Sequence, residues 1–333
     1  AQACLRRQSS SLDPIFMFPA TTTKATSSRS LVSRLILFAA KLGVSGLLLA
    51  WLFYQTSWQE LAGIWARIEW VPVVFGLLLY FVNLLISSIR WRMIANLEGF
   101  EEKRLGQYFR YTLISSYFGL LLPTSVGGDA VKAFYLSQGW KRYPRALVTV
   151  IIDRLSGLWV LTTASGFAVV FIGFPDLPVP IRYGAILLSV ASIVTVIFLP
   201  RLLSRFRAIL PNGAIGEHIR NPRAWPLIIL LVIAVQLSGA WMYLMIAKSL
   251  GVDLSLSFLI VFYIFTVLVS VFPISLNGIG LRESAAVFLF SQLHLPTSMG
   301  IAFGLTYLLI VAIMGAVGGV VYFTMPRVGR VEA

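Results

Sequence analysis

The sequence predicts an all-α polytopic membrane protein with six transmembrane helices and two re-entrant helical hairpins, arranged as two inverted repeats. Of its 333 residues, 58% are hydrophobic and only 12% are charged, whereas a soluble domain carries about 25% charged residues. The apolar residues lie in blocks near the ~20 residues that a helix needs to cross a bilayer. Two of these blocks are interrupted by Pro and Gly, which predicts broken helices instead of straight ones.

The strongly basic composition points to a membrane surface. The chain has 27 Lys and Arg against 13 Asp and Glu, a net charge of +14. In a polytopic protein such an excess indicates cytoplasmic loops that face anionic lipid, so we expect no nucleic-acid partner. Cys4 is the single cysteine, and His218 and His294 lack zinc-site spacing. Because P-loop and hydrolase motifs are absent too, we predict no cofactor, no metal ligand and no catalytic residue.

The first repeat is predicted over residues 35–174, after a basic, Ser- and Thr-rich stretch at 1–34 that we expect to be a disordered cytosolic tail. Between its first two spans, apolar residues recur at helical spacing over 58–68, which predicts a helix lying flat in the interface. The spans of this repeat are 35–54, 71–89 and 146–174, with a hairpin at about 108–137.

The second repeat is predicted over residues 182–325. Its last span carries two G-x-x-x-G spacings, which favour close helix packing: Gly300 with Gly304, and Gly315 with Gly319. The spans of this repeat are 183–200, 224–247 and 298–325, with a hairpin at about 254–293.

The distribution of basic residues favours hairpins over two additional full crossings. With hairpins, 20 Lys and Arg lie on the cytosolic side and three outside. With full crossings, the numbers become 14 and nine. The positive-inside rule therefore selects the hairpins, and it places both termini in the cytoplasm.

The two interruptions superpose at an offset of 150 residues. Pro123, Ser125, Gly128 and Lys132 fall on Pro273, Ser275, Gly278 and Arg282, respectively. Because each half has three crossings, the second half is inverted relative to the first. That arrangement is typical of transporters whose broken helices form a binding site near the bilayer midplane. Chance similarity of two kinks is the alternative.

The residues around the interruptions could bind an anion. Segments that begin after Gly128 and Gly280 are predicted to present helix N-termini, which attract phosphate or carboxylate. Arg282 is disfavoured at such a position unless an anion or Glu283 compensates it. Charges in mid-span cost at least ~2.5 kcal/mol each, which makes them candidates for function. The candidate substrate-binding residues are Ser125, Gly128, Asp129, Lys132, Asp153, Arg154, Ser275, Asn277, Gly278, Gly280, Arg282 and Glu283.

A closed charge network is the alternative interpretation of the same residues. Three cations, Lys132, Arg154 and Arg282, would then be balanced by three carboxylates, and no ligand would be needed. The carboxylates are Asp129, Asp153 and Glu283.

Three motifs together resemble the flippase-like membrane domain of lysylphosphatidylglycerol synthases: PTSVGGDAVK at 123–132, DRLSG at 153–157 and PISLNGIGLRE at 273–283. The resemblance covers roughly residues 35–325. It implies two inverted repeats that move a lipid between leaflets. It places Asp129, Lys132, Asp153, Arg154, Arg282 and Glu283 around the head-group path. Only eight residues follow Met325, so we expect a standalone member without the soluble aminoacyl-transfer domain.

The function that the sequence favours is that of an integral membrane lipid translocase, not an enzyme. It would move an anionic phospholipid or a lipid-linked head group across the plasma membrane. The alternative is a non-transporting component of a glycolipid or polyprenyl-phosphate-linked sugar pathway. The expected partner is a membrane lipid, with a second copy of the chain or a pathway enzyme as a further partner class.

Overall fold

The computed structural model consists of helices and the turns between them over the residues that it describes. These are 56–122, 127–138, 142–172, 179–206, 222–271, 278 and 280–325, with isolated positions between 43 and 54, and they contain no strand. The predicted tail and most of the predicted first span lie outside them. So do Ser125, Ser275 and Asn277.

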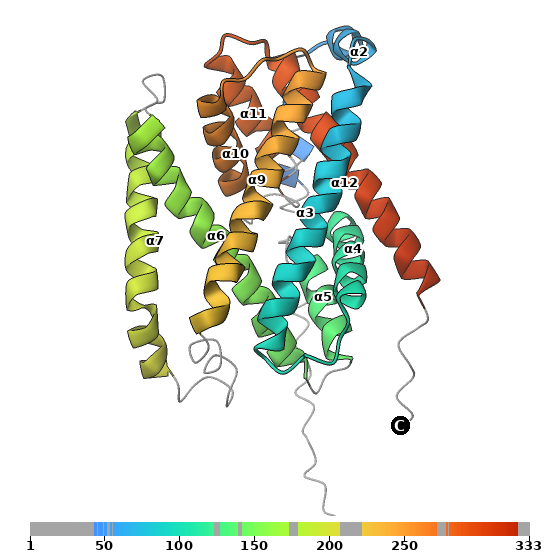
Figure 1. Ribbon diagram of the computed structural model, residues 1–333. Coiled ribbons are helices and arrows are strands. Elements are labelled where there is room, and N and C mark those ends of the chain that lie inside the picture. The colour runs from blue at the N-terminus through green and yellow to red at the C-terminus, as the bar shows by residue number, and fades with distance from the viewer. Residues whose placement is uncertain are drawn as a thin grey trace, which may run out of the picture. The chain divides into compact units, whose positions relative to one another are not determined.

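The helices follow one another in the order shown in Figure 1. They are α2 (Trp58–Ala66), α3 (Trp70–Asn96), α4 (Leu105–Leu121), α5 (Gly127–Ser137), α6 (Tyr143–Ile172), α7 (Val179–Phe206), a 3-10 turn (Pro222–Ala224), α9 (Trp225–Ser249), α10 (Leu256–Val271), α11 (Leu281–Ser291) and α12 (Thr297–Thr324).

Four helices of the described residues are long and apolar enough to cross a bilayer: α3, α6, α9 and α12. They contain the predicted spans 71–89, 146–174 (up to Ile172), 224–247 (from Trp225) and 298–325 (up to Thr324). The predicted span 183–200 lies inside α7, and the stretch predicted to lie in the interface forms α2. Ser57 caps α2, because its side-chain oxygen accepts a hydrogen bond from the Glu60 amide at 3.2 Å.

Both interrupted blocks form two helices each instead of one. The first pair is α4 and α5, which pack against each other, and the second is α10 and α11. Figure 1 shows the two pairs at opposite ends of the helices: α4 and α5 at the lower end, α10 and α11 at the upper end. Gly128 is needed at the first interruption, since a Cβ there would overlap the carbonyl oxygen of Ser115 in α4. At the second, Gly278 and Gly280 adopt positive φ angles of 80° and 86°.

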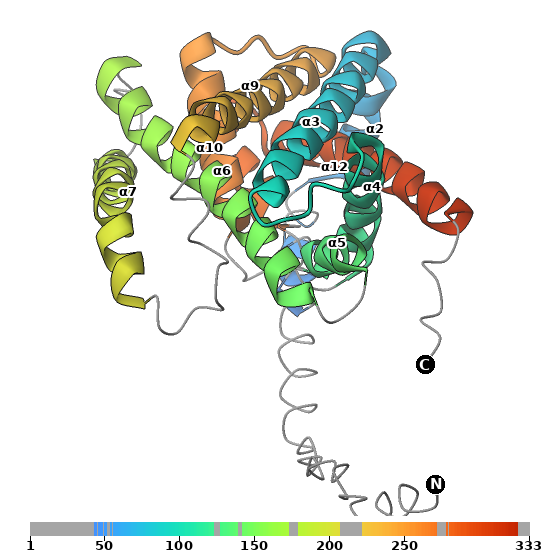
Figure 2. The same ribbon diagram turned by 60° about the horizontal axis from the view of Figure 1, so that its bottom comes forward.

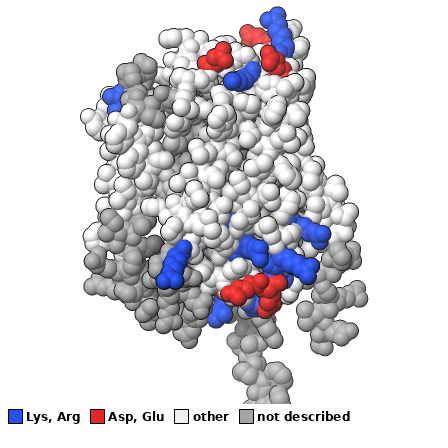
Figure 3. Space-filling view, viewed as in Figure 1, with Lys and Arg blue, Asp and Glu red and all other residues white. Residues whose placement is uncertain are grey.

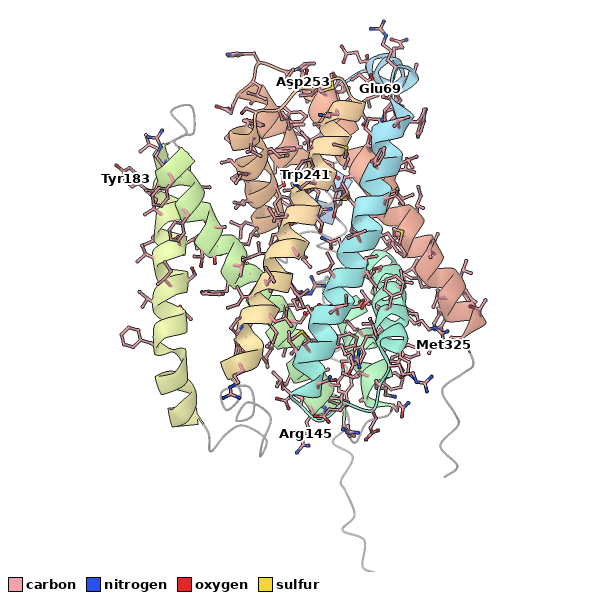
Figure 4. The ribbon with its side chains drawn as sticks, viewed as in Figure 1. Glu69, Arg145, Tyr183, Trp241, Asp253 and Met325 are labelled. Carbon is pink, nitrogen blue, oxygen red and sulfur yellow. The ribbon has the colours of Figure 1, made fainter. Side chains whose placement is uncertain are left out.

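Helices that the sequence predicts to be equivalent in the two halves run in opposite directions. In Figure 4, Glu69 before α3 and Asp253 after α9 lie at the upper end, so α3 descends and α9 ascends. Arg145 at the start of α6 and Met325 after α12 lie at the lower end, so α6 ascends and α12 descends.

Helix α12 contacts both broken pairs through glycines. At Gly300 a Cβ would lie 2.6 Å from the Cα of Val287 in α11, and at Gly304 it would lie 2.5 Å from the Cγ of Glu283. Further along α12, a Cβ at Gly318 would overlap the carbonyl oxygen of Leu113 in α4. Gly315 and Gly319 are likewise pressed against Leu120 and Tyr117 of α4. The predicted close packing of both G-x-x-x-G spacings is confirmed.

We expect Gly318→Ala to destabilise the fold and Gly184→Ala to leave it unchanged or slightly more stable. The added methyl group at Gly318 meets the backbone of α4, and overpacking of this kind costs about 1–3 kcal/mol. Gly184 in α7 has open space around it, so Ala there improves only the helix propensity. Thermal unfolding of the detergent-solubilised protein measures both effects. Equal melting temperatures of the two variants would contradict the packing assigned to α12.

Candidate functional site

Asp153 in α6 is the centre of a buried charge cluster, which we call the Asp153 cluster and which also contains Arg90 and Lys132. The Nε of Arg90 in α3 lies 2.8 Å from Asp153 Oδ1, and the Nζ of Lys132 in α5 lies 3.5 Å from Oδ2. The three side chains are 5–7% exposed. Lys132 Nζ also lies 4.1 Å from the ring centroid of Trp91, which is a cation–π contact. The cluster ties α3, α5 and α6 together.

Arg90 is a residue of the site that the sequence analysis did not predict. It was counted with the cytosolic residues because the apolar run ends at Ile89. Helix α3 continues to Asn96, and this extension buries Arg90 against α6. Residues beyond an apolar run can therefore stay inside the protein when the helix continues past the run.

Arg154 and Asp129 form a second, more open ion pair. Two guanidinium nitrogens of Arg154, Nε and Nη2, donate to the two carboxylate oxygens of Asp129 at 2.8 and 2.9 Å. Asp129 lies in the first turn of α5, where the helix dipole favours a carboxylate. The Arg154 side chain is 67% exposed although it lies about 16 Å along α6 from Tyr143. A guanidinium facing hydrocarbon would be costly, so its exposed side suits a polar ligand.

Arg282 lies in the first turn of α11 and forms no ion pair with any carboxylate of the described residues. Its Nε is buried without a hydrogen-bond partner, and no carboxylate of the described residues lies within 4 Å of its guanidinium. Its guanidinium carbon lies 4.0 Å from the ring centroid of Tyr307 in α12. Glu283 accepts a hydrogen bond from the Gly280 amide at 2.6 Å and so caps its own helix. The closed network is therefore formed for Asp129 and Asp153 but not for Arg282.

Tyrosines connect the two charged regions. The phenol of Tyr80 in α3 lies within electrostatic range of both Arg154 and Arg282. Tyr243 in α9 lies within electrostatic range of Arg282, and its ring centroid is 5.7 Å from that of Tyr307. The sequence analysis missed these tyrosines. Their signal was their place inside apolar blocks, since membrane proteins otherwise concentrate tyrosine at the interfaces.

The site carries an excess of positive charge. With every group ionised, four cations face three carboxylates, which leaves a net charge of +1. The N-termini of α5 and α11 add positive potential. The cations are Arg90, Lys132, Arg154 and Arg282, and the carboxylates are Asp129, Asp153 and Glu283. The arrangement is suited to binding an anion.

The predicted site residues fall into two groups. The first interruption brings Gly128, Asp129 and Lys132 together with Asp153 and Arg154. The second brings Gly278, Gly280, Arg282 and Glu283 together at the start of α11. Within the described part of the chain, no three His, Cys, Asp or Glu side chains are grouped as metal ligands.

We expect Asp153→Asn to destabilise the protein far more than Asp129→Asn. Removing the Asp153 charge leaves two buried cations without a counter-charge, and breaking a buried ion pair costs about 3–5 kcal/mol. Removing the Asp129 charge leaves Arg154 without its partner, but the Arg154 side chain is mostly exposed and can turn to water or a ligand, so the cost should be smaller than for Asp153→Asn. The melting temperatures of the two isosteric variants measure the difference. A larger loss in Asp129→Asn would contradict the assigned burial.

Comparison with known proteins identifies the family. A search of curated proteins gives no match. The family model described as the lysylphosphatidylglycerol synthase TM region matches residues 38–319, which covers most of the chain and both interruptions. The predicted resemblance is confirmed, and the four apolar helices agree with a membrane protein. The chain belongs to the family of lysylphosphatidylglycerol synthase transmembrane regions.

Proposed function

We propose that this protein is a lipid translocase that moves an anionic phospholipid or a lipid-linked anionic head group between the leaflets. The observation that carries the proposal is Arg282, a cation deep among the helices without a carboxylate partner in the described residues. Its counter-charge is available from a ligand phosphate. The family description supports a function that involves membrane lipid.

The head group would bind between the two broken pairs. Arg154 offers an exposed guanidinium on one side, Arg282 offers its unpartnered Nε on the other, and the phenol of Tyr80 lies within electrostatic range of both. Charge-assisted hydrogen bonds from arginine to phosphate are short and strong. The acyl chains would stay in the bilayer while the head group passes.

The proposed membrane arrangement has six crossings and two re-entrant hairpins in inverted repeats. Opposite placement of the broken pairs supports it, as do the opposite directions of α3 and α9 and of α6 and α12. Figure 3 shows Lys and Arg side chains gathered at the lower end and a smaller group at the upper end. By the positive-inside rule, the lower end and both termini would be cytoplasmic in the plasma membrane.

A non-transporting component of a glycolipid or polyprenyl-phosphate pathway is the second candidate. The Asp153 cluster favours it, since that cluster is closed and nearly inaccessible without any ligand. A component of this kind would bind its lipid without moving it. The two candidates differ in whether bound lipid changes leaflet.

We expect Arg282→Ala to slow translocation of fluorescent phosphatidylglycerol by roughly ten- to a hundredfold, because a lost hydrogen bond to a charged group is worth about 1.5–3 kcal/mol. The measurement is reduction of the label by external dithionite in liposomes that contain the purified protein. Asp129→Ala should also slow translocation, since it releases Arg154 from its position. Arg223→Ala is the matched control, because this exposed arginine precedes α9, away from the site.

Two outcomes would refute translocation by this site. Wild type and Arg282→Ala could translocate the labelled lipid at the same rate, which would exclude Arg282 from the path of the head group. Alternatively, wild type could move neither phosphatidylglycerol nor phosphatidylcholine while still binding phosphatidylglycerol. That result would favour the non-transporting component.

The orientation can be measured by cysteine labelling of intact cells. In a Cys4→Ser background, Asp253→Cys at the upper end should react with a membrane-impermeant maleimide. Glu101→Cys, in the loop between α3 and α4, should react only after permeabilisation, because the basic lower end is expected to be cytosolic. Labelling of both cysteines from outside would contradict the proposed topology.

A further inference from the structure

An apolar crevice lies between α6, α7 and α10, apart from the charged residues. It is lined by Ala168 and Val169 of α6, Ala185 of α7, and Ile264, Phe265 and Leu268 of α10. Its volume is about 50 Å³, and it is open on one side. That is well below the volume of a pocket that encloses a small molecule, about 300–1,000 Å³, so it has room for a few methylene groups and not for a whole phospholipid. We propose that the crevice binds the end of one acyl chain of a membrane phospholipid.

The chemistry of the lining selects a hydrocarbon occupant. Ser165 is the polar side chain at the crevice, and its hydroxyl already donates to the carbonyl oxygen of Thr162 at 2.7 Å. The remaining lining side chains are apolar. A polar ligand would lose its hydrogen bonds with water here without gaining new ones, which is costly.

The crevice exists because α7 packs closely on α6 through small residues but makes no extensive contact with α10. Ser189 of α7 donates to the carbonyl oxygen of Thr163 at 3.0 Å, and its side chain fills the place that a Cβ on Gly166 would take. Among the described helices, α7 makes its extensive contacts with α6, and it lies at the outer edge of the helices in Figure 2. The crevice is open on one side, and the proposed acyl chain would enter it there from the bilayer.

The crevice lies at a suitable distance from the proposed head-group site. Ser165 follows Arg154 by 11 residues, three turns of α6, so the two lie on nearly the same face and about 16 Å apart along the axis. One leaflet contributes about 15 Å of hydrocarbon, half of the ~30 Å core. A lipid whose phosphate contacts Arg154 thus has chains long enough to reach the crevice. This step depends on the proposed function.

Side chains between the two sites determine the route. Gln236 of α9 donates to the carbonyl oxygen of Gly157 at 3.1 Å and accepts from the Tyr263 hydroxyl at 2.7 Å. Leu161 of α6 is buried at the same level. These contacts fill the interior between Arg154 and the crevice, so the chain would enter from the side that faces the bilayer.

The test uses phosphatidylglycerol with a photoactivatable diazirine near the end of one acyl chain, in phosphatidylcholine nanodiscs with the full chain. After irradiation, mass spectrometry should find more adducts at Phe265 and Leu268 than at Phe198, an exposed residue of α7. Ala168→Phe, which fills the crevice, should reduce the Phe265 and Leu268 adducts about tenfold, equivalent to about 1.4 kcal/mol.

Matched variants keep the result interpretable. Val170→Phe adds an aromatic ring on the lipid-facing side of α6, where Val170 is 60% exposed, and should leave the adducts unchanged. Ala185→Phe fills the crevice from α7 and replaces Ala168→Phe if the latter fails to fold. Equal labelling of Phe198 and Phe265, or undiminished labelling in the filled variants, would overturn the inference. Preserved crevice labelling without head-group translocation would count against the proposed function alone.

Discussion

The close approach of α4 and α11 to one helix, α12, is the constraint on which the rest of the structure depends. Glycines remove the side chains from two stretches of α12, so that α11 packs at Gly300 and Gly304 and α4 packs at Gly318. Each of these helices is half of a broken pair. Fixing them also fixes the starts of α5 and α11, where the candidate charges lie. In a bilayer, where packing between helices replaces the hydrophobic effect as the main attraction, such glycine contacts carry much of the stability.

The two broken pairs use their charges differently. At the first, every carboxylate has a cation, and Asp153 has two. At the second, Glu283 serves as a helix cap and leaves Arg282 to aromatic rings. The Tyr307 ring compensates the Arg282 guanidinium, whose Nε is buried, only in part, because a desolvated cation–π contact is worth about 2 kcal/mol or more whereas burying an ion costs several kcal/mol. The electrostatic imbalance therefore lies in the second half, and there an anionic head group would gain most.

Much of this could be predicted from the sequence. The length of the apolar blocks predicted the long helices, and Pro and Gly inside two of those blocks predicted both interruptions. The three sequence motifs together indicated the family. The partners of the charges could not be predicted, since pairing depends on which faces of α3, α5 and α6 meet. Arg90 was missed for a different reason: hydropathy does not locate the end of a helix to within a few residues, and α3 continues beyond its apolar run. Tyr80 and Tyr307 were missed because their neighbours come from distant helices.

Two amide side chains connect the halves and bear on the motion that a translocase needs. Asn83 of α3 donates to the carbonyl oxygen of Val235 at 2.7 Å and to the Ser238 hydroxyl at 2.8 Å, both in α9. Helices α3 and α9 also pack along their lengths, so they would move as one body. Between α6 and α9, the described side chains contribute one amide hydrogen bond, from Gln236 to Gly157. The contact of α6 with α9 is therefore weaker than that of α3 with α9, and a movement of α6 against α9 would load the Asp153 cluster, which holds α6 to α3 and α5.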